Sequence, residues 1–334
     1  MESICLLLLF FTVLEFFQFR KYPNSGLFDF STKATLPIRA VLSIGIIAHH
    51  TEYWQFSTWG GVIVACFFFI SGYGLLKSYK QKKEEYLKNF IKKRMAKICI
   101  PFIYAILFFH TLNLCVLHKE YETMIPSLLI GNTYIVLPSS WFVFAIIIVY
   151  LVFWCIAKIF TDEKVIILSF TISTFIFCII SKQILHFGNW WQISALATPL
   201  GMIVGSFEDI ICRFICAYKK SIILISACII PILYIFSLLC KYHLYITCLI
   251  FPLYILLLIY IKGTSANNKI INYIGKISFE IYLVQGIMIG LLKHIHNYCL
   301  FFGLSVFSSL IIASLLYYIK NKTINLIKKY DTEF

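Results

Sequence analysis

The sequence predicts an all-α polytopic integral membrane protein with about eleven transmembrane helices. Three observations predict this class. Of the 334 residues, 60% are hydrophobic and only 13% are charged, which is more apolar surface than a soluble core of this size can bury. The apolar residues fall into runs of spanning length with short polar loops between them. The basic residues gather in alternate loops.

Each predicted span is an apolar run, and glycine, proline, asparagine or charged residues mark its ends. The spans cover residues 3–19, 36–53, 60–76, 98–117, 140–158, 165–183, 190–207, 221–239, 243–261, 277–293 and 301–319. The loops at 22–26, 131–132, 138–140 and 263–269 hold the clearest turn residues. The first span lacks a basic start and a small-residue cleavage site, so we interpret it as a retained helix and not a signal peptide.

No hydrophilic stretch is long enough to fold separately, so we expect one main domain. Residues 1–32 form an additional N-terminal transmembrane helix with a cytoplasmic linker, residues 33–320 form the transmembrane domain, and residues 321–334 form a short cytoplasmic tail. The 12 cysteines mostly lie in apolar runs and form no C-x-x-C pair. This pattern favours free thiols over a disulfide framework or a metal site.

The basic residues indicate the orientation of the helices. With the N-terminus outside, the cytoplasmic side holds 25 of the 29 lysines and arginines, counted with the adjoining span edges. The outer side keeps Lys119, Lys182, Lys241 and Lys293. An error in the number of helices before a basic loop would destroy this asymmetry, so we expect the C-terminus in the cytoplasm. The net charge of +14 then indicates membrane lipid as a partner, and not nucleic acid.

The span over residues 36–53 carries ionisable residues, which are expensive inside a membrane and usually functional. Arg39 lies at its cytoplasmic end, and His49, His50 and Glu52 lie at its outer end. Eleven residues separate Arg39 from His50, which puts both on one helix face roughly 16 Å apart along the axis. His49 is turned away by about 80°. This face suits an elongated ligand with an anionic end; the alternative is that Arg39 reaches lipid phosphates and His50 lies at the interface.

The basic segment at 77–97 ends in Arg94 and Lys97, which lie one helical turn apart and are followed by Pro101. Such a cationic pair is suited to clamping phosphates. The alternative is that the segment anchors the protein on anionic lipid.

Small residues within 67–74 permit close helix approach, which is a structural role.

A late helix places two polar residues, Glu280 and Gln285, inside an apolar run. A buried Glu280 requires a partner, for which Arg39 or a hydroxyl is the candidate. His294 and His296 lie near the outer end of this helix, where an interfacial position is favoured over metal ligation.

These segments, in this order, resemble the membrane-bound acyltransferase 3 family, whose members O-acetylate sugars. The first core helix of the family is matched by Arg39 to His50, and its FF-x-[LI]-S-G-[YF] motif is matched by Phe67 to Gly74, which include Ser71, Gly72 and Tyr73. Its basic R-x-x-R motif is matched by Arg94-x-x-Lys97, which precedes Pro101. Ser140-Trp141-Phe142 match a helix start, and Ile277 to Val284, which include Tyr282, match the S-Y/F-x-x-Y-L motif. The resemblance covers residues 33–319, about ten core helices. Lys97 replaces the second arginine, and Gln285 stands where the family often has histidine.

The resemblance implies acyl transfer from acyl-CoA, a cytoplasmic co-substrate that is not permanently bound. Arg94, Lys97 and Arg39 would bind its phosphates. His50, with His49 beside it, would deprotonate the acceptor hydroxyl or carry the acyl group as acyl-His. The implied substrate-binding or structural residues are Ser71, Gly72, Tyr73, Trp141, Glu280, Tyr282 and Gln285. The expected acceptor is a cell-surface or lipid-linked glycan, and the expected acyl group is acetyl or succinyl. The expected location is the bacterial inner (plasma) membrane. The resemblance does not decide whether the protein forms a homo-oligomer.

Three other classes are alternatives to acyl transfer. A polysaccharide polymerase, ligase or flippase would carry its charges in a large outer loop, but the longest outer loop, 118–139, holds few. A secondary transporter would show inverted repeats and broken helices, and the sequence indicates neither. An inactive acyltransferase relative that serves as a partner is the third class, and Gln285 keeps it open.

Overall fold

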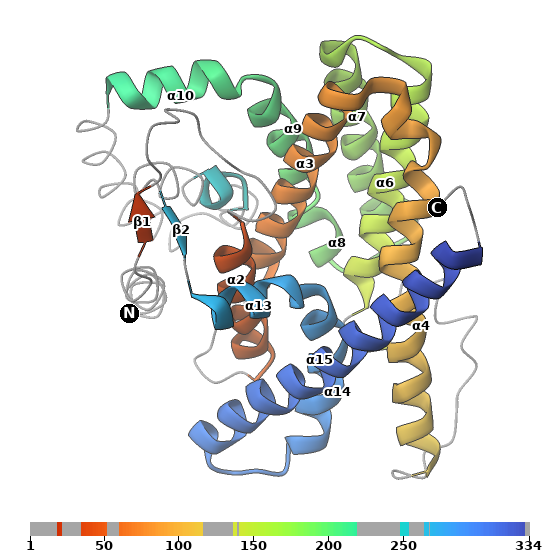
Figure 1. Cartoon of the computed structure of the whole chain (residues 1–334), viewed down its shortest axis with the longest axis vertical. Helices are drawn as coiled ribbons and strands as arrows, with labels where there is room; N and C mark the ends of the chain where they lie inside the picture. The colour runs from red at the N-terminus through yellow and green to blue at the C-terminus, as the bar shows by residue number, and fades with distance from the viewer. Residues whose placement is uncertain are drawn as a thin grey trace.

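Helices dominate the structure, a computed structural model (Figure 1). It describes residues 19–21, 35–51, 60–115, 136–138, 140–218, 248–253, 264–266 and 268–330. The long helices are α3 (Gly60–Lys88), α4 (Phe90–Cys115), α6 (Trp141–Ile159), α7 (Glu163–Ile179), which continues into the π-helical η1 (Ile180–Ile184), and α15 (Tyr298–Tyr330). The shorter helices are α2 (Leu36–His50), α8 (Trp190–Ile193), α9 (Ala197–Ser206), α10 (Glu208–Ala217), α13 (Lys269–Lys276) and α14 (Ser278–Leu292). Two short strands, β1 (Phe19–Lys21) and β2 (Thr264–Ala266), pair antiparallel.

Five of the described helices, namely α3, α4, α6, α7 with η1, and α15, are long and apolar enough to cross a membrane. The pair α13 and α14, bent by 74°, adds a sixth span if it is counted as one. Large apolar side chains lie exposed on these helices, including Ile103 (54% exposed), Leu168 (62%) and Phe307 (63%). Such surfaces are expected where lipid is the solvent. The predicted helical membrane class is therefore confirmed.

Three predicted spans take a different form in the structure. The span at 36–53 corresponds to α2, which has only 15 residues. The span at 190–207 is divided between α8 and α9. Pro199 lies in the first turn of α9, where its missing backbone N–H leaves no helical hydrogen bond unmade. The span at 277–293 corresponds to α14, which α13 precedes at a sharp bend. Outside the described residues lie the predicted spans 3–19 and 221–239 and most of 243–261, so the number eleven stays a prediction.

Glycines bring the central helices into backbone contact. The most extensive packing between two elements joins α3 and α9. A Cβ added at Gly72 would lie 2.0 Å from the carbonyl oxygen of Thr198, and one added at Gly201 would lie 2.1 Å from the carbonyl oxygen of Phe69. Close approach through small residues is typical of helix pairs in membranes, where no hydrophobic force drives helices together.

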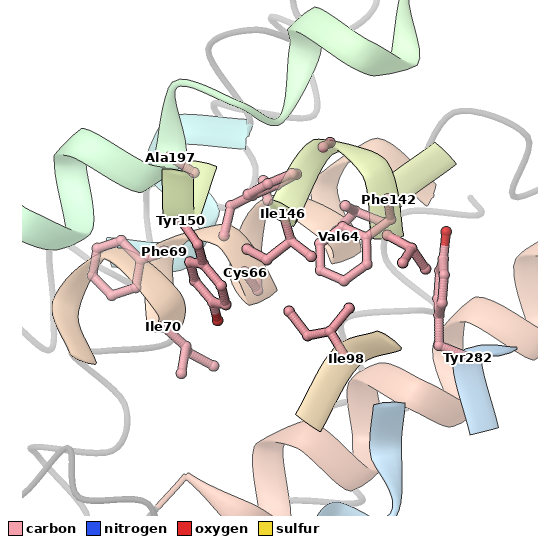
Figure 2. Close-up of a cluster of buried hydrophobic side chains, with 14 of the residues drawn as sticks. Val64, Cys66, Phe69, Ile70, Ile98, Phe142, Ile146, Tyr150, Ala197 and Tyr282 are labelled. Atoms are coloured by element: carbon pink, nitrogen blue, oxygen red, sulfur yellow. The ribbon is translucent and has the colours of Figure 1, made fainter. Parts of the chain in front are cut away.

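A buried apolar cluster fixes the positions of the helices around α3. Figure 2 shows Phe69 of α3, Ile98 of α4, Ile146 and Tyr150 of α6, and Tyr282 of α14 within this cluster. Aromatic rings supply much of its volume, and several pairs meet edge to face, the geometry that the ring quadrupole favours. The cluster therefore holds in place the helices that carry the candidate site.

Candidate functional site

The helix α2 carries the two residues on which the sequence argument depends. Arg39 lies in its first turn and His50 is its last residue, and the helix is unbroken between them. With a rise of about 1.5 Å per residue, the two Cα atoms stand roughly 16 Å apart along the axis. The Arg39 Nε is buried and has no hydrogen-bond partner among the described residues. An unsatisfied buried N–H of a charged group is costly, so this position is suited to an anionic ligand.

The structure brings Arg94 of α4 to the same end of the bundle as Arg39. Arg94 donates a hydrogen bond to the Tyr86 hydroxyl (2.9 Å), and its guanidinium lies 5.1 Å from the ring centre of Tyr150. Arg94 also hydrogen-bonds Tyr150, and it interacts electrostatically with Arg39. Two arginines that the sequence separates by 55 positions therefore lie within electrostatic range of each other. The aromatic ring and hydroxyl of Tyr150 stabilise the charge of Arg94.

Lys97 follows Arg94 by one turn of α4 and extends this group of positive charges. It interacts electrostatically with Arg94, Lys93, Lys320 and Lys328, all of them cations. Among the described residues, Arg39, Arg94 and Lys97 form no ion pair with a carboxylate. The three side chains predicted to bind phosphates thus share one positively charged region, and α15 lies beside it.

Glu280 has a different partner from the two that the sequence suggested. Its side chain is 1% exposed and forms an ion pair with Lys320 of α15, not with Arg39 or a hydroxyl. The ammonium of Lys320 also lies 4.3 Å from the ring centre of Tyr317. The expectation of Arg39 was wrong because α15 packs along α14 and delivers a lysine at this level of the membrane.

At the other end of α2, the two histidines are in contact, with ring centres 4.8 Å apart. His49 packs on the first residue of α3, because a Cβ added at Gly60 would lie 2.4 Å from its Nε2. The adjoining Gly61 contacts Ile193 of α8 in the same way, at 3.3 Å. His49 is therefore committed to the contact between α2 and α3, whereas His50 is its half-buried neighbour at the helix end.

The other predicted site residues lie in helix contacts. Gly72 forms the close crossing with α9, Tyr73 is buried beside Gly205, and Ser71 is half-buried on the same turn. Among the residues that the structure describes, none has an atom within 4 Å of a Cβ added at Gly74 of the same motif, so the small-residue contact does not extend to it there. The motif therefore joins α3 to α9 and does not meet the basic residues through these contacts.

Trp141 and Tyr282 pack at the start of α6. Trp141 lies 5.9 Å from Trp191 between ring centres, and Tyr282 lies 5.2 Å from Phe142. The Phe142 backbone N–H donates to the Tyr282 hydroxyl. Because Ser140 provides no side-chain cap there, Tyr282 satisfies one of the unpaired N–H groups of this helix start.

Gln285 lies one turn beyond Tyr282 on α14 and is fully buried. Neither its amide nitrogen nor its amide oxygen has a hydrogen-bond partner among the described residues. Buried amides are normally satisfied, so the position is suited to a polar ligand group or a bound water.

Sequence reasoning missed three residues of the basic region: Tyr86, Tyr150 and Lys320. Tyr150 lies within an apolar run and Lys320 follows the end of one, so hydropathy gives no signal for either. Tyr86 lies within the basic segment itself, where a hydroxyl among lysines and arginines was the available hint.

A metal-dependent site finds no support among the described residues, where no group of three or more His, Cys, Asp and Glu side chains could hold an ion. The fold and the site together define a polytopic membrane protein with cations gathered at one end of α2 and imidazoles at the other.

A family model described as an acyltransferase domain, of the acyltransferase 3 type, matches residues 38–318. The chain belongs to this family, which confirms the resemblance drawn from the five motifs. Searches of curated proteins and of solved structures found no match. The match begins just before Arg39 and ends just before Lys320, so α15 continues beyond it.

Proposed function

We propose that this membrane acyltransferase moves an acyl group, acetyl as the first expectation, from cytoplasmic acyl-CoA to a hydroxyl of a cell-surface or lipid-linked glycan. One observation carries the proposal. Arg39 and Arg94 lie close enough to interact electrostatically at one end of α2, and His50 stands at the other end of the same unbroken helix.

The basic end suits the donor. Arg39, Arg94 and Lys97 supply cations without carboxylate partners among the described residues, and the CoA moiety is a polyanion. The pantetheine arm is long and narrow, so it suits a path along α2 from Arg39 towards His50. Acyl-CoA acts as a co-substrate that leaves as CoA after transfer.

The chemistry at His50 requires a hydroxyl acceptor and a thioester. As a general base, His50 takes the hydroxyl proton while the oxygen attacks the thioester carbonyl, the C–S bond breaks, and the CoA thiolate leaves and is then protonated. As a transient carrier, the imidazole of His50 itself attacks the thioester, and the acyl group passes to the sugar in a second step. The packing of His49 on Gly60 supports His50 as the reacting residue and His49 as its neighbour in position.

The test measures O-acetylation of purified surface polysaccharide by NMR. Cells carry the wild type, His50→Ala, His49→Ala or a deletion, and a blot checks expression of each variant. We expect loss of the acetyl signal in the deletion and His50→Ala strains and its retention with His49→Ala.

Two outcomes would overturn the proposal. Equal acetylation in all four strains, with an altered polysaccharide chain length, would indicate a polymerase or export function. Loss of acetylation in the deletion strain, without any loss in His50→Ala cells that express the protein, would indicate an inactive partner of another acyltransferase.

A further inference from the structure

Gln285 is a buried polar side chain of α14 to which the proposed mechanism gives no role. It is 0% exposed, and neither its amide nitrogen nor its amide oxygen has a hydrogen-bond partner among the described residues. A buried amide without hydrogen bonds costs free energy, so its presence calls for a ligand or a bound water. Because the amide both donates and accepts, a matching ligand presents an acceptor as well as a donor.

The contacts of its neighbours on α14 show which way Gln285 points. Glu280 faces α15, where Lys320 pairs with it. Tyr282 faces the start of α6, where its hydroxyl accepts from a backbone N–H. On a helix with 3.6 residues per turn, Gln285 is turned about 140° from Glu280 and about 60° from Tyr282. Gln285 therefore points away from α15 and into the bundle.

Gln285 also lies at an intermediate level along α2. The two helices begin together, because Gly275, just before α14, packs directly on the Leu36 carbonyl at the start of α2. From there α2 packs against α14 (Figure 1). At about 1.5 Å per residue, Gln285 stands roughly 10 Å from the start of α14, whereas Arg39 and His50 stand roughly 5 Å and 21 Å from the start of α2. The amide is therefore placed between the levels of the arginine and the histidine.

A donor that follows α2 needs polar partners along this path. The pantetheine arm of CoA carries two amide groups, and each loses its hydrogen bonds to water when it enters the protein. Between Arg39 and His49, the only polar side chain of α2 is Ser43, whose hydroxyl already donates to the Arg39 carbonyl. A partner for the amides has to come from a helix that packs against α2, and α14 is such a helix.

We propose that Gln285 binds the pantetheine arm of acyl-CoA and so sets how far the arm advances towards His50. Its amide nitrogen donates to a carbonyl of the arm, and its amide oxygen accepts from an N–H of the arm. The inference rests on the proposed function for the identity of the donor, and it adds α14 to the site. Holding the arm between the phosphate site and His50 places the thioester at the imidazole.

Two probes separate the arm from the nucleotide. CoA carries both, whereas 3′-phospho-ADP keeps the phosphates of CoA and lacks the arm. The full-length protein is placed in nanodiscs of zwitterionic lipid, and the affinity for each probe is measured by calorimetry for the wild type, Gln285→Leu and Ser309→Ala. The melting temperature of each protein without ligand is recorded as well.

Ser309 of α15 is the matched control. It is also 0% exposed, and its hydroxyl has no hydrogen-bond partner among the described residues. On α15 it is within about 20° of Lys320, the side that meets Glu280. Ser309→Ala therefore removes an unpartnered buried group on the side of α14 away from Gln285.

We expect Gln285→Leu to weaken CoA binding by roughly fivefold to tenfold, because its hydrogen bonds to the arm are lost. Its affinity for 3′-phospho-ADP should stay within about twofold of the wild type, and Ser309→Ala should bind both probes as the wild type does. Without ligand, Gln285→Leu should melt at the same temperature as the wild type or higher, since leucine has a similar volume and no polar group to satisfy.

Three outcomes would contradict these expectations. Equal CoA affinity of Gln285→Leu and the wild type would show that the amide holds a water only, which overturns the inference and leaves the proposed function standing. Equal weakening of both probes would show a structural disturbance of the phosphate end, and would also overturn it. Failure of the wild type to bind CoA would instead overturn the donor assignment.

Analogues of CoA provide a test on the wild-type protein, which does not depend on the folding of a variant. In each analogue an ester replaces one of the amides of the arm, so that an N–H is lost. We expect one analogue to bind the wild type roughly threefold to tenfold more weakly than CoA, and Gln285→Leu to bind that analogue and CoA within about twofold of each other. If the wild type bound both analogues as tightly as CoA, the inference would be wrong.

Discussion

At the scale of single residues, Tyr150 holds Arg94 in place. Its ring lies beneath the Arg94 guanidinium, and its hydroxyl hydrogen-bonds that group. A tyrosine in this position stabilises a positive charge in a region where lipid and protein screen it poorly.

Replacing Tyr150 by phenylalanine should weaken donor binding and leave the reaction step intact. The ring contact with Arg94 is kept, while a hydrogen bond to a charged group, about 1.5–3 kcal/mol, is lost. We expect the KM for acetyl-CoA to rise roughly tenfold with little change in kcat. Kinetics of the purified enzyme measure both, and Tyr318→Phe, at a position that is 67% exposed on α15, is the control. A fall in kcat at unchanged KM would contradict this assignment.

Gly72 and Gly74 offer a matched test of the contact between α3 and α9. A Cβ at Gly72 would lie 2.0 Å from the Thr198 carbonyl oxygen, whereas one at Gly74 meets no described residue within 4 Å. We expect Gly72→Ala to destabilise the protein by about 1–3 kcal/mol, because the two backbones must separate. Gly74→Ala should leave stability unchanged or slightly raised. Thermal unfolding in detergent compares them, and equal melting temperatures would show that the crossing is not tight.

Single residues also show which parts of the site can be predicted from the sequence. The pair Arg39 and Arg94 was predicted to serve one ligand, because both stand in polar positions at the ends of apolar runs and match family motifs. The contribution of Tyr150 was not predicted, since a single hydroxyl within an apolar span does not differ from the many tyrosines of the sequence. Lys320, the partner of Glu280, was also missed. It follows the predicted span 301–319, and hydropathy alone assigns such a residue to solvent.

At the scale of elements, the ion pair between α14 and α15 is the main polar contact that joins these two helices. Lys320 and Glu280 are 12% and 1% exposed, so both charges have left water and each depends on the other. Removing one partner leaves a buried charge without compensation, which is more damaging than removing both.

A double-mutant cycle should show this asymmetry. We expect Glu280→Leu and Lys320→Leu each to lower stability by about 3–5 kcal/mol, and the double variant to be more stable than either single one. Chemical unfolding followed by tryptophan fluorescence measures all four proteins. Strictly additive losses in the double variant would show that the two side chains do not depend on each other.

The breaks within helices mark the limit of prediction at this scale. Hydropathy measures the length and polarity of a run, so it predicted uninterrupted spans at 190–207 and 277–293. The first is interrupted before Pro199, and the second is preceded by a bend of 74° where α13 turns across α2. Both breaks depend on partners far away in the chain, and a local pattern does not contain them.

At the scale of the whole molecule, the distribution of charge predicts the orientation in the membrane. The structure places Arg94, Lys97 and Lys320 in one region, and the orientation of that region towards the cytoplasm stays a prediction. An orientation with these ends outside would oppose the positive-inside rule.

Reporter fusions check this orientation directly. Alkaline phosphatase, which is active only outside the cytoplasm, should be active when fused after Gly131 and inactive when fused after Glu85 or after the C-terminus. A green fluorescent protein at the C-terminus should fluoresce, because it folds in the cytoplasm. Phosphatase activity after Glu85 would invert the topology and exclude Arg94 and Lys97 from contact with cytoplasmic acyl-CoA.

The contact between Leu36 and Gly275 has a consequence for how the protein is made. A Cβ at Gly275 would lie 1.9 Å from the Leu36 carbonyl oxygen, so α2 is seated directly on the chain that precedes α14. Ribosomes deliver α2 early and α13 late, so α2 enters the bilayer long before its seat exists. During that interval α2 lacks the backbone surface on which it packs. Chains that terminate before Gly275 should therefore be recognised as unfinished by membrane proteases, even though most of their hydrophobic segments are already inserted.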